Sequence, residues 1–119
     1  MKIFLLLSTS LLFLQSGFAA TTCESWYQEA GGAIEKSEMS VIKETASNQV
    51  FKASLRGYDF KVDWNKELTT FYVFIEAGGE RILVTTARVP TENHPENITD
   101  LNLPGGPRLT VNCLTKNLK

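Results

Sequence analysis

The sequence has only one histidine, His94, and only two cysteines, Cys23 and Cys113. Zinc sites need clusters of histidine and cysteine at short spacing, so the usual zinc patterns are excluded. A hydrolase needs a nucleophile, a base and an orienting group, and no spacing of serine, threonine or carboxylate residues singles out such a set. We therefore identify no catalytic residue, no metal site and no cofactor, and the sequence favours a protein that is not an enzyme.

The chain also lacks an excess of charge of either sign. Its 12 basic and 13 acidic residues give a formal net charge of -1 at pH 7. Nucleic acids and anionic membranes attract proteins that carry a clear excess of lysine and arginine. The composition therefore predicts that neither is a partner.

Long apolar runs are confined to the N-terminus. The run over 3–14 follows Lys2 and is broken only by three polar residues, and the sequence Gly-Phe-Ala ending at Ala19 fits the small-x-small rule of signal peptidase. The run is shorter than the ~20 residues of a membrane-spanning helix. We expect a signal peptide over 1–19, cleaved after Ala19. The remainder, 20–119, is then one secreted or periplasmic domain without an integral membrane segment.

The two cysteines stand near the two ends of that domain. Exported proteins fold where disulfides persist, and two cysteines allow one intramolecular connectivity. We expect a Cys23–Cys113 disulfide, which would stabilise the domain by about 4–5 kcal/mol in the chain-entropy model. Free thiols or an intermolecular bridge are the alternatives.

The clearest local signal is Gly78-Gly79, which stands between two runs rich in aromatic and β-branched residues over 68–89. Two glycines supply the positive φ angles of type I′ and II′ turns, so the sequence predicts a β-hairpin. Counting outward from this turn pairs Ala77 with Glu80, Glu76 with Arg81, Ile75 with Ile82, Phe74 with Leu83, Val73 with Val84, and Tyr72 with Thr85.

Further strands are predicted over 41–46, 50–55, 58–64 and 108–113. Apolar and charged residues alternate strictly over 58–64, which is typical of a strand with one buried and one wet face. An even loop before the hairpin puts these apolar residues on the same side as Phe71. The expected core face consists of Tyr58, Phe60, Val62, Trp64, Phe71, Val73, Ile75, Ile82 and Val84.

The segment from Thr21 to Glu24 has the pattern of a capping box, and Cys23, Trp26 and Tyr27 recur at helical spacing. These features predict a short N-terminal helix. The expected fold class is α+β, with this helix packed on an antiparallel β-meander of about five strands and the ends joined by the disulfide. The alternative is a small β-sandwich or barrel with the helix as a cap. A helix followed by a meander resembles the cystatin-type inhibitors in the order of its elements, which implies an inhibitor-like role.

All four prolines fall between Pro90 and Pro107, where the sequence predicts a long irregular connection. Connections of this length are often functional or mobile. Asn97-Ile98-Thr99 within it is a formal N-glycosylation sequon, which matters in a eukaryotic source. We expect three apolar side chains to hold the connection against the body of the protein; they are Ile98, Leu101 and Leu103.

Tyr72, Phe74 and Leu83 are left on the face opposite the predicted helix. Either the 90–107 connection covers them, or they form an exposed patch for a partner or a second copy of the protein, or the register counted from the turn is wrong. We therefore expect a small exported, non-enzymatic binding domain that engages a protein in the envelope or extracellular space. The candidate partner-binding residues are Tyr72, Phe74, Leu83, His94, Leu101 and Leu103. The alternatives are a small secreted hydrolase that acts on a polymer through a carboxylate site, and a self-associating structural protein.

Overall fold

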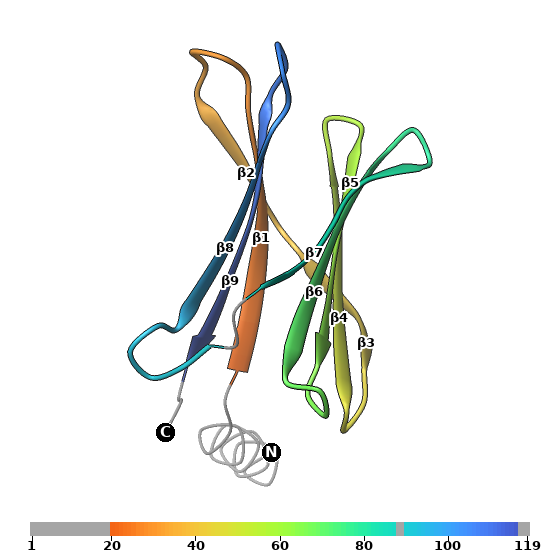
Figure 1. Ribbon diagram of the computed structural model, residues 1–119, viewed down its shortest axis with the longest axis vertical. Coiled ribbons are helices and arrows are strands. Elements are labelled where there is room, and N and C mark those ends of the chain that lie inside the picture. The colour runs from red at the N-terminus through yellow and green to blue at the C-terminus, as the bar shows by residue number, and fades with distance from the viewer. Residues whose placement is uncertain (1–19, 88–89, 117–119) are drawn as a thin grey trace, which may run out of the picture.

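Nine antiparallel strands make up the fold in the residues that the computed structural model describes, 20–87 and 90–116 (Figure 1). The predicted signal peptide lies outside these residues. In chain order the strands are β1 (Ala20–Gln28), β2 (Ile34–Glu38), β3 (Ser40–Glu44), β4 (Asn48–Leu55), β5 (Tyr58–Asn65), β6 (Thr70–Ala77), β7 (Glu80–Ala87), β8 (Glu96–Asn102) and β9 (Arg108–Lys116).

The strands form two sheets that pack face to face (Figure 1). The first sheet has the order β2-β1-β9-β8, and the second has the order β3-β4-β5-β6-β7. The fold is a β-sandwich, so the predicted α+β class is wrong: the described part of the chain contains no helix. The alternative class, a β-sandwich, fits the chain, although without the helical cap. The resemblance to cystatin-type inhibitors loses its basis together with the helix.

The segment predicted as a helix is strand β1. Cys23 and Ser25 are buried and alternate with the outward-facing Glu24 and Trp26, which is the period of a strand. β1 pairs with β9 from Ala20 to Gln28 and with β2 along its second half. A capping interaction is worth only about 1 kcal/mol, so backbone hydrogen bonds on both sides of the strand outweigh it.

β2 and β3 follow one another almost directly and carry the chain from the first sheet to the second at Met39. The Met39 side chain is 4% exposed, and its backbone N–H donates to the carbonyl of Cys23 at 2.9 Å. β2 pairs with β1 before the chain crosses to the second sheet. This crossing closes one flank of the sandwich.

The predicted meander is confirmed in β3 to β7. The loop between β5 and β6 is even, because Trp64 lies opposite Phe71 and Asn65 opposite Thr70. The Trp64 and Phe71 rings stack with centroids 4.2 Å apart on the inner face. The Gly78-Gly79 turn is also confirmed, with positive φ at both glycines and Ala77 opposite Glu80.

One part of the predicted register is wrong, because β7 contains a β-bulge. Beyond the pair of Glu76 with Arg81, the next pair is Ile75 with Leu83, so Ile82 is the extra residue of the bulge. The inner and outer faces of β7 are therefore exchanged relative to the prediction. Leu83 packs against the core, whereas Ile82 and Val84 are 36% and 54% exposed.

Strand β8 replaces part of the connection that the sequence predicted over 90–107. It pairs with β9 in the first sheet from Glu96 to Asn102. The connection therefore does not fold over Tyr72 and Phe74, which lie on the outer face of the other sheet. Pro95 precedes the strand and Pro104 follows it, so the prolines bound β8 without interrupting it.

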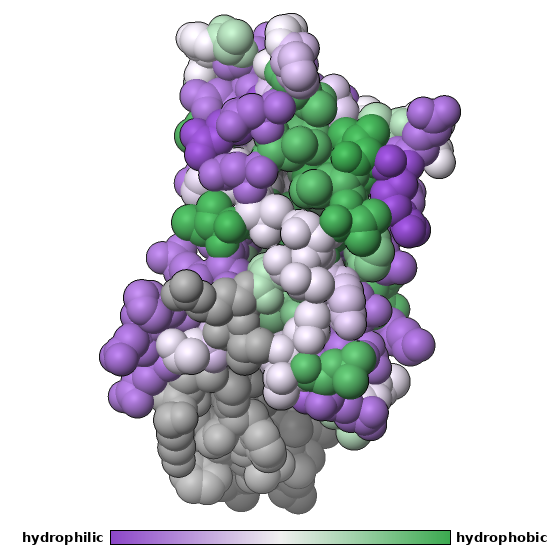
Figure 2. Space-filling view, viewed as in Figure 1, coloured by the Kyte–Doolittle hydropathy of each residue, from purple (hydrophilic) through white to green (hydrophobic). Residues whose placement is uncertain are grey.

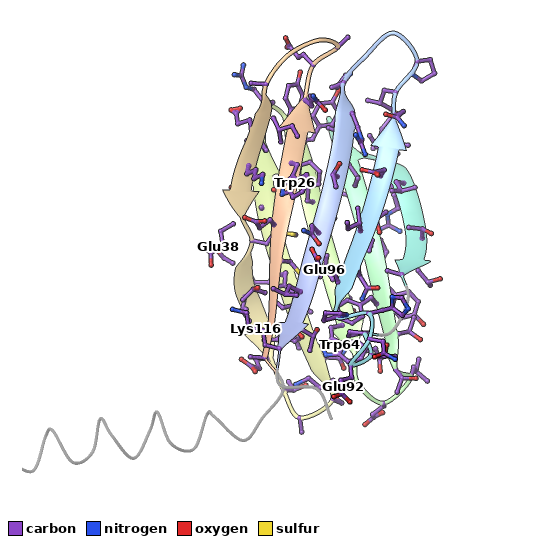
Figure 3. The ribbon with its side chains drawn as sticks, turned by 90° about the vertical axis from the view of Figure 1, so that its left-hand side faces the viewer. Trp26, Glu38, Trp64, Glu92, Glu96 and Lys116 are labelled. Atoms are coloured by element: carbon purple, nitrogen blue, oxygen red, sulfur yellow. A yellow bond between two sulfur atoms is a disulfide. The ribbon has the colours of Figure 1, made fainter. Side chains whose placement is uncertain are left out.

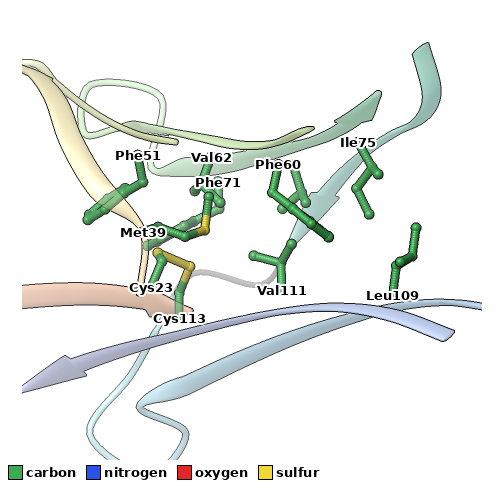
Figure 4. Packing of buried hydrophobic residues seen from close by; sticks show 11 residues of the cluster. Cys23, Met39, Phe51, Phe60, Val62, Phe71, Ile75, Leu109, Val111 and Cys113 are labelled. Atoms are coloured by element: carbon green, nitrogen blue, oxygen red, sulfur yellow. A yellow bond between two sulfur atoms is a disulfide. The ribbon is translucent and has the colours of Figure 1, made fainter. Parts of the chain in front are cut away.

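The core lies between the two sheets, where Figure 4 shows the disulfide beside Met39. The predicted Cys23–Cys113 disulfide is confirmed, but it joins directly opposed residues of the neighbouring strands β1 and β9. It does not join a helix to a strand. The other large buried side chains come from both sheets and are Phe51, Phe60, Val62, Phe71, Val73, Ile75, Leu109 and Val111.

Candidate functional site

The flank of the sandwich opposite the Met39 crossing is bordered by two edge strands. β7 ends the second sheet and β8 ends the first, and Figure 1 looks onto the gap between them. We call this flank the β7/β8 side; it consists of β7, β8 and residues 90–95. An edge strand presents backbone N–H and C=O groups that have no partner within its own sheet. At the β7/β8 side, two such edges border the same opening.

A polar crevice of about 410 Å³ opens at the β7/β8 side. Asn97 projects into it from the inner face of β8 and is only 5% exposed. Its Nδ2 atom is buried and has no hydrogen-bond partner among the described residues. A buried amide donor without an acceptor costs free energy, so a ligand group that accepts from it is favoured. The crevice is lined by Thr85, Thr86, Ala87, His94, Glu96, Asn97, Ile98 and Thr99.

The charged and hydrogen-bonding groups of the crevice restrict which chemical groups can bind in it. Its lining within the described residues contains no lysine or arginine, and its one carboxylate there is that of Glu96. Glu96 Oε2 accepts a hydrogen bond from Asn112 Nδ2 at 3.3 Å, and no cation pairs with it within the described ranges. The buried Nδ2 donor of Asn97 therefore favours groups that accept hydrogen bonds.

The other end of the β7/β8 side is apolar. Leu83 from β7, Leu101 from β8 and Leu103 just after it are partly buried and pack against the core. Figure 2, which looks onto this flank, shows hydrophobic side chains gathered between the two sheets in the upper half of the view. We call these three residues the leucine strip. The flank thus combines a polar crevice at one end with an apolar strip at the other.

Four of the six predicted partner-binding residues meet on this flank. His94 lines the crevice, and the leucine strip supplies the other three. Leu83 was predicted on the outer face together with Tyr72 and Phe74, but the bulge in β7 turns it inward. The structure therefore separates the six residues into two groups on different surfaces.

Tyr72 and Phe74 lie on the outer face of the second sheet, where Phe74 is opposite Val84 on β7. The Phe74 ring lies 5.4 Å from the Nζ atom of Lys61 and 5.0 Å from the Cζ atom of Arg81. Cations near the face of an aromatic ring are attracted to it, and their stems cover part of its surface. Phe74 is consequently only partly exposed, which reduces the apolar surface offered by this patch.

The outer face of the first sheet carries a second hollow, of about 370 Å³, which sequence reasoning missed because it assigned β1 to a helix. Glu24, Glu38, Glu96 and Asn112 line it together with Thr22, Cys23 and Leu114. Figure 3 shows Glu38 and Glu96 on this face, with Trp26 above them. The Nζ atom of Lys36 lies 4.4 Å from the Trp26 ring centroid.

Asp100 on β8 is already paired within the sheet. Arg108 Nη2 donates to its Oδ2 at 2.8 Å, and Thr110 Oγ1 donates to its Oδ1 at 2.6 Å. The hydrogen bond from Arg108 is the main cause that holds the pKa of Asp100 below its ordinary value, assisted by Thr110 and opposed by partial burial. Asp100 is therefore an ionised group whose charge is compensated within the protein.

Among residues 20–87 and 90–116, no three histidine, cysteine or acidic side chains are arranged to hold a metal ion. The same residues contain no helix that is long and apolar enough to cross a membrane. The disulfide fits a protein that resides in an oxidising, extracellular or periplasmic compartment. No protein-family model, curated protein or solved structure matches the chain.

Proposed function

We propose that the chain is a small exported, non-enzymatic binding domain that engages a protein partner through the β7/β8 side. Export rests on the predicted signal peptide with cleavage after Ala19, and it agrees with the Cys23–Cys113 disulfide. The partner is then a protein of the envelope or the extracellular space.

The observation that carries the proposal is the joint presence of two strand edges, a leucine strip and an unsatisfied donor on one flank. Strand edges and partly exposed apolar side chains are costly to leave open to solvent and to other chains. A partner that covers the flank supplies acceptors and apolar contacts together. The outer face of the second sheet carries the partly covered Tyr72 and Phe74 beside the exposed Val84, but no unsatisfied buried donor among the described residues.

The hydrolase alternative gains one feature from the structure, the hollow that gathers Glu24, Glu38 and Glu96. A hydrolytic site needs carboxylates in distinct environments, usually beside a group that orients the substrate. No tyrosine or histidine is among the residues that line this hollow. The binding proposal therefore has the stronger support.

Site-specific photo-cross-linking tests the proposal. A benzophenone side chain replaces Ile98, which is 56% exposed on β8, and in a matched control it replaces Lys52, which is exposed on the other sheet. Both full-length variants are produced and irradiated in the exporting cell. We expect a discrete protein adduct from position 98 and none from position 52. An adduct from position 52 alone would move the site to the outer face of the second sheet, and an adduct with a second copy of the chain would favour self-association.

A further inference from the structure

We propose that the partner is recognised as an extended segment that adds to the free edge of β8 and becomes the fifth strand of the first sheet. This inference rests on the proposed function and names the element that the β7/β8 side receives. Strand addition draws its affinity from main-chain hydrogen bonds and its specificity from alternate side chains.

The four edge strands of the sandwich differ in how they are protected. β3 and β7 each contain a bulge, which twists an edge and interrupts the pattern that an incoming strand would pair with. β2 is only five residues long, carries Lys36, and leads directly into the crossing at Met39. β8 pairs with β9 in unbroken register over seven residues, and its sequence ENITDLN contains neither lysine nor proline. β8 is thus the edge best suited to accept a strand.

The inner face of β8 specifies alternate positions of that segment. Asn97, Thr99 and Leu101 point inward, since they lie opposite the inner residues Cys113, Val111 and Leu109 of β9. Directly opposed side chains in a sheet interact with one another. The unsatisfied Nδ2 of Asn97 calls for a side chain that accepts a hydrogen bond, such as glutamine or asparagine. The position opposite Leu101 is apolar because it adjoins the leucine strip.

The outer face of β8 determines which charge the partner segment carries opposite Glu96. Asp100 is compensated by Arg108, whereas Glu96 accepts only from the amide of Asn112 in the part of the chain described. A lysine or arginine opposite Glu96 therefore gains an ion pair, and a carboxylate there meets like charge. Ile98, exposed between them, pairs best with a β-branched residue. The partner segment therefore has six residue types in turn, counted along β8 from Glu96 to Leu101. They are a basic residue, a hydrogen-bond acceptor, a β-branched residue, a small residue, a polar residue and an apolar residue.

A second copy of the chain fits this pattern poorly. When two β8 strands overlap fully in antiparallel order, Asn97 of each copy faces the leucine at position 101 of the other. The Nδ2 donor then stays unsatisfied, and no basic residue reaches Glu96, because β8 contains none. These mismatches favour a different chain as the source of the strand.

The test uses a synthetic seven-residue peptide of sequence Thr-Leu-Thr-Ala-Val-Gln-Lys. Antiparallel pairing with β8 places its lysine opposite Glu96. Binding to the full-length oxidised protein is measured by fluorescence anisotropy. Two further peptides carry N-methyl groups on the two alternate sets of backbone nitrogens. In an added strand only one set donates to β8. We expect one methylated peptide to lose binding at least tenfold and the other to keep it within about threefold.

Position 97 provides a second readout. We expect the Asn97→Val protein to bind the glutamine peptide about three- to tenfold more weakly than the parent protein does. We expect it to bind a peptide with valine in place of glutamine as well as or better than the parent protein does. This exchange of preference would not arise from a merely structural role of Asn97.

Equal effects of the two methylated peptides, no preference change at position 97, or no binding of the parent peptide would each overturn strand addition at β8. A cross-link from position 98 to a partner protein in that case would leave the proposed function standing. A concentration-dependent dimer that the peptide does not dissociate would overturn the inference in favour of self-association.

Discussion

Because of the bulge at Ile82, we expect truncation of two neighbouring residues of β7 to have different effects on stability. Leu83 packs against the core opposite the buried Ile75, and Val84 is 54% exposed on the outer face. Full truncation of a buried leucine to alanine costs about 2–5 kcal/mol, and Leu83 is only partly buried, so Leu83→Ala should cost about 1–2 kcal/mol. Val84→Ala should cost about 0.5 kcal/mol or less, as at most surface positions.

Urea unfolding of the two oxidised variants beside the parent protein measures both losses. Alanine is a poorer strand former than either residue, but this penalty enters both variants and largely cancels in their difference. A difference of about 1 kcal/mol corresponds to roughly 4–8 °C in the melting temperature of a domain this size. Equal losses, or a larger loss for Val84→Ala, would mean that the hairpin has the regular register with Val84 inside, and the assignment of Leu83 to the leucine strip would fail.

Three further predictions concern the disulfide, Asp100 and Asn97. Replacing Cys23 and Cys113 together by alanine should lower the free energy of unfolding by about 4–5 kcal/mol, measured in urea against the oxidised parent, and a loss under about 1 kcal/mol would contradict the chain-entropy argument. The pKa of Asp100 is lowered in the folded state, mainly by Arg108, so its contribution to stability is present above the unfolded value near 3.8 and is lost as pH falls through the lower folded value. Thermal unfolding between pH 6 and pH 2 should show that Asp100→Asn weakens this acid dependence, and an unchanged pH profile would refute the assignment. Asn97→Asp should lower the free energy of unfolding by about 2–3 kcal/mol at pH 7, because burial raises the pKa of a carboxyl group there and opposes its charge. This loss should shrink toward pH 4. The control Asn97→Ala should change the free energy of unfolding by less than about 1 kcal/mol at either pH.

Local pattern was enough to predict the central meander. Strict alternation over 58–64 and the Gly78-Gly79 turn define β5, β6 and the start of β7, because both signals act between residues that are close in sequence. The disulfide was equally predictable from cysteine count and compartment. Each of these features depends on short-range chemistry or on a single possible connectivity.

The N-terminal segment shows where such reasoning fails. Its helical spacing and its strand alternation both fit a run of nine residues, and the sequence does not show that β9 lies beside it. Pairing with a strand some 90 residues away decides the conformation. Tertiary contacts of this kind override a weak local preference.

The candidate site was only partly predictable. His94, Leu101 and Leu103 were identified because they lie within the proline-rich stretch, and Asn97 was noted only as part of a sequon. Asparagine and aspartate in ENITDLN disfavour a strand, so β8 and its crevice emerge only from the pairing with β9. The buried, unsatisfied amide of Asn97 has no sequence signal.

Hydrogen–deuterium exchange with the partner identified by cross-linking tests most directly whether the β7/β8 side is the binding surface. The full-length oxidised protein is measured alone and saturated with that partner, and exchange is followed in peptides from each strand. We expect slower exchange over 96–102, and to a smaller extent over 80–87, with β3 to β5 unchanged. Slower exchange confined to 40–65, with 96–102 unaffected, would contradict it.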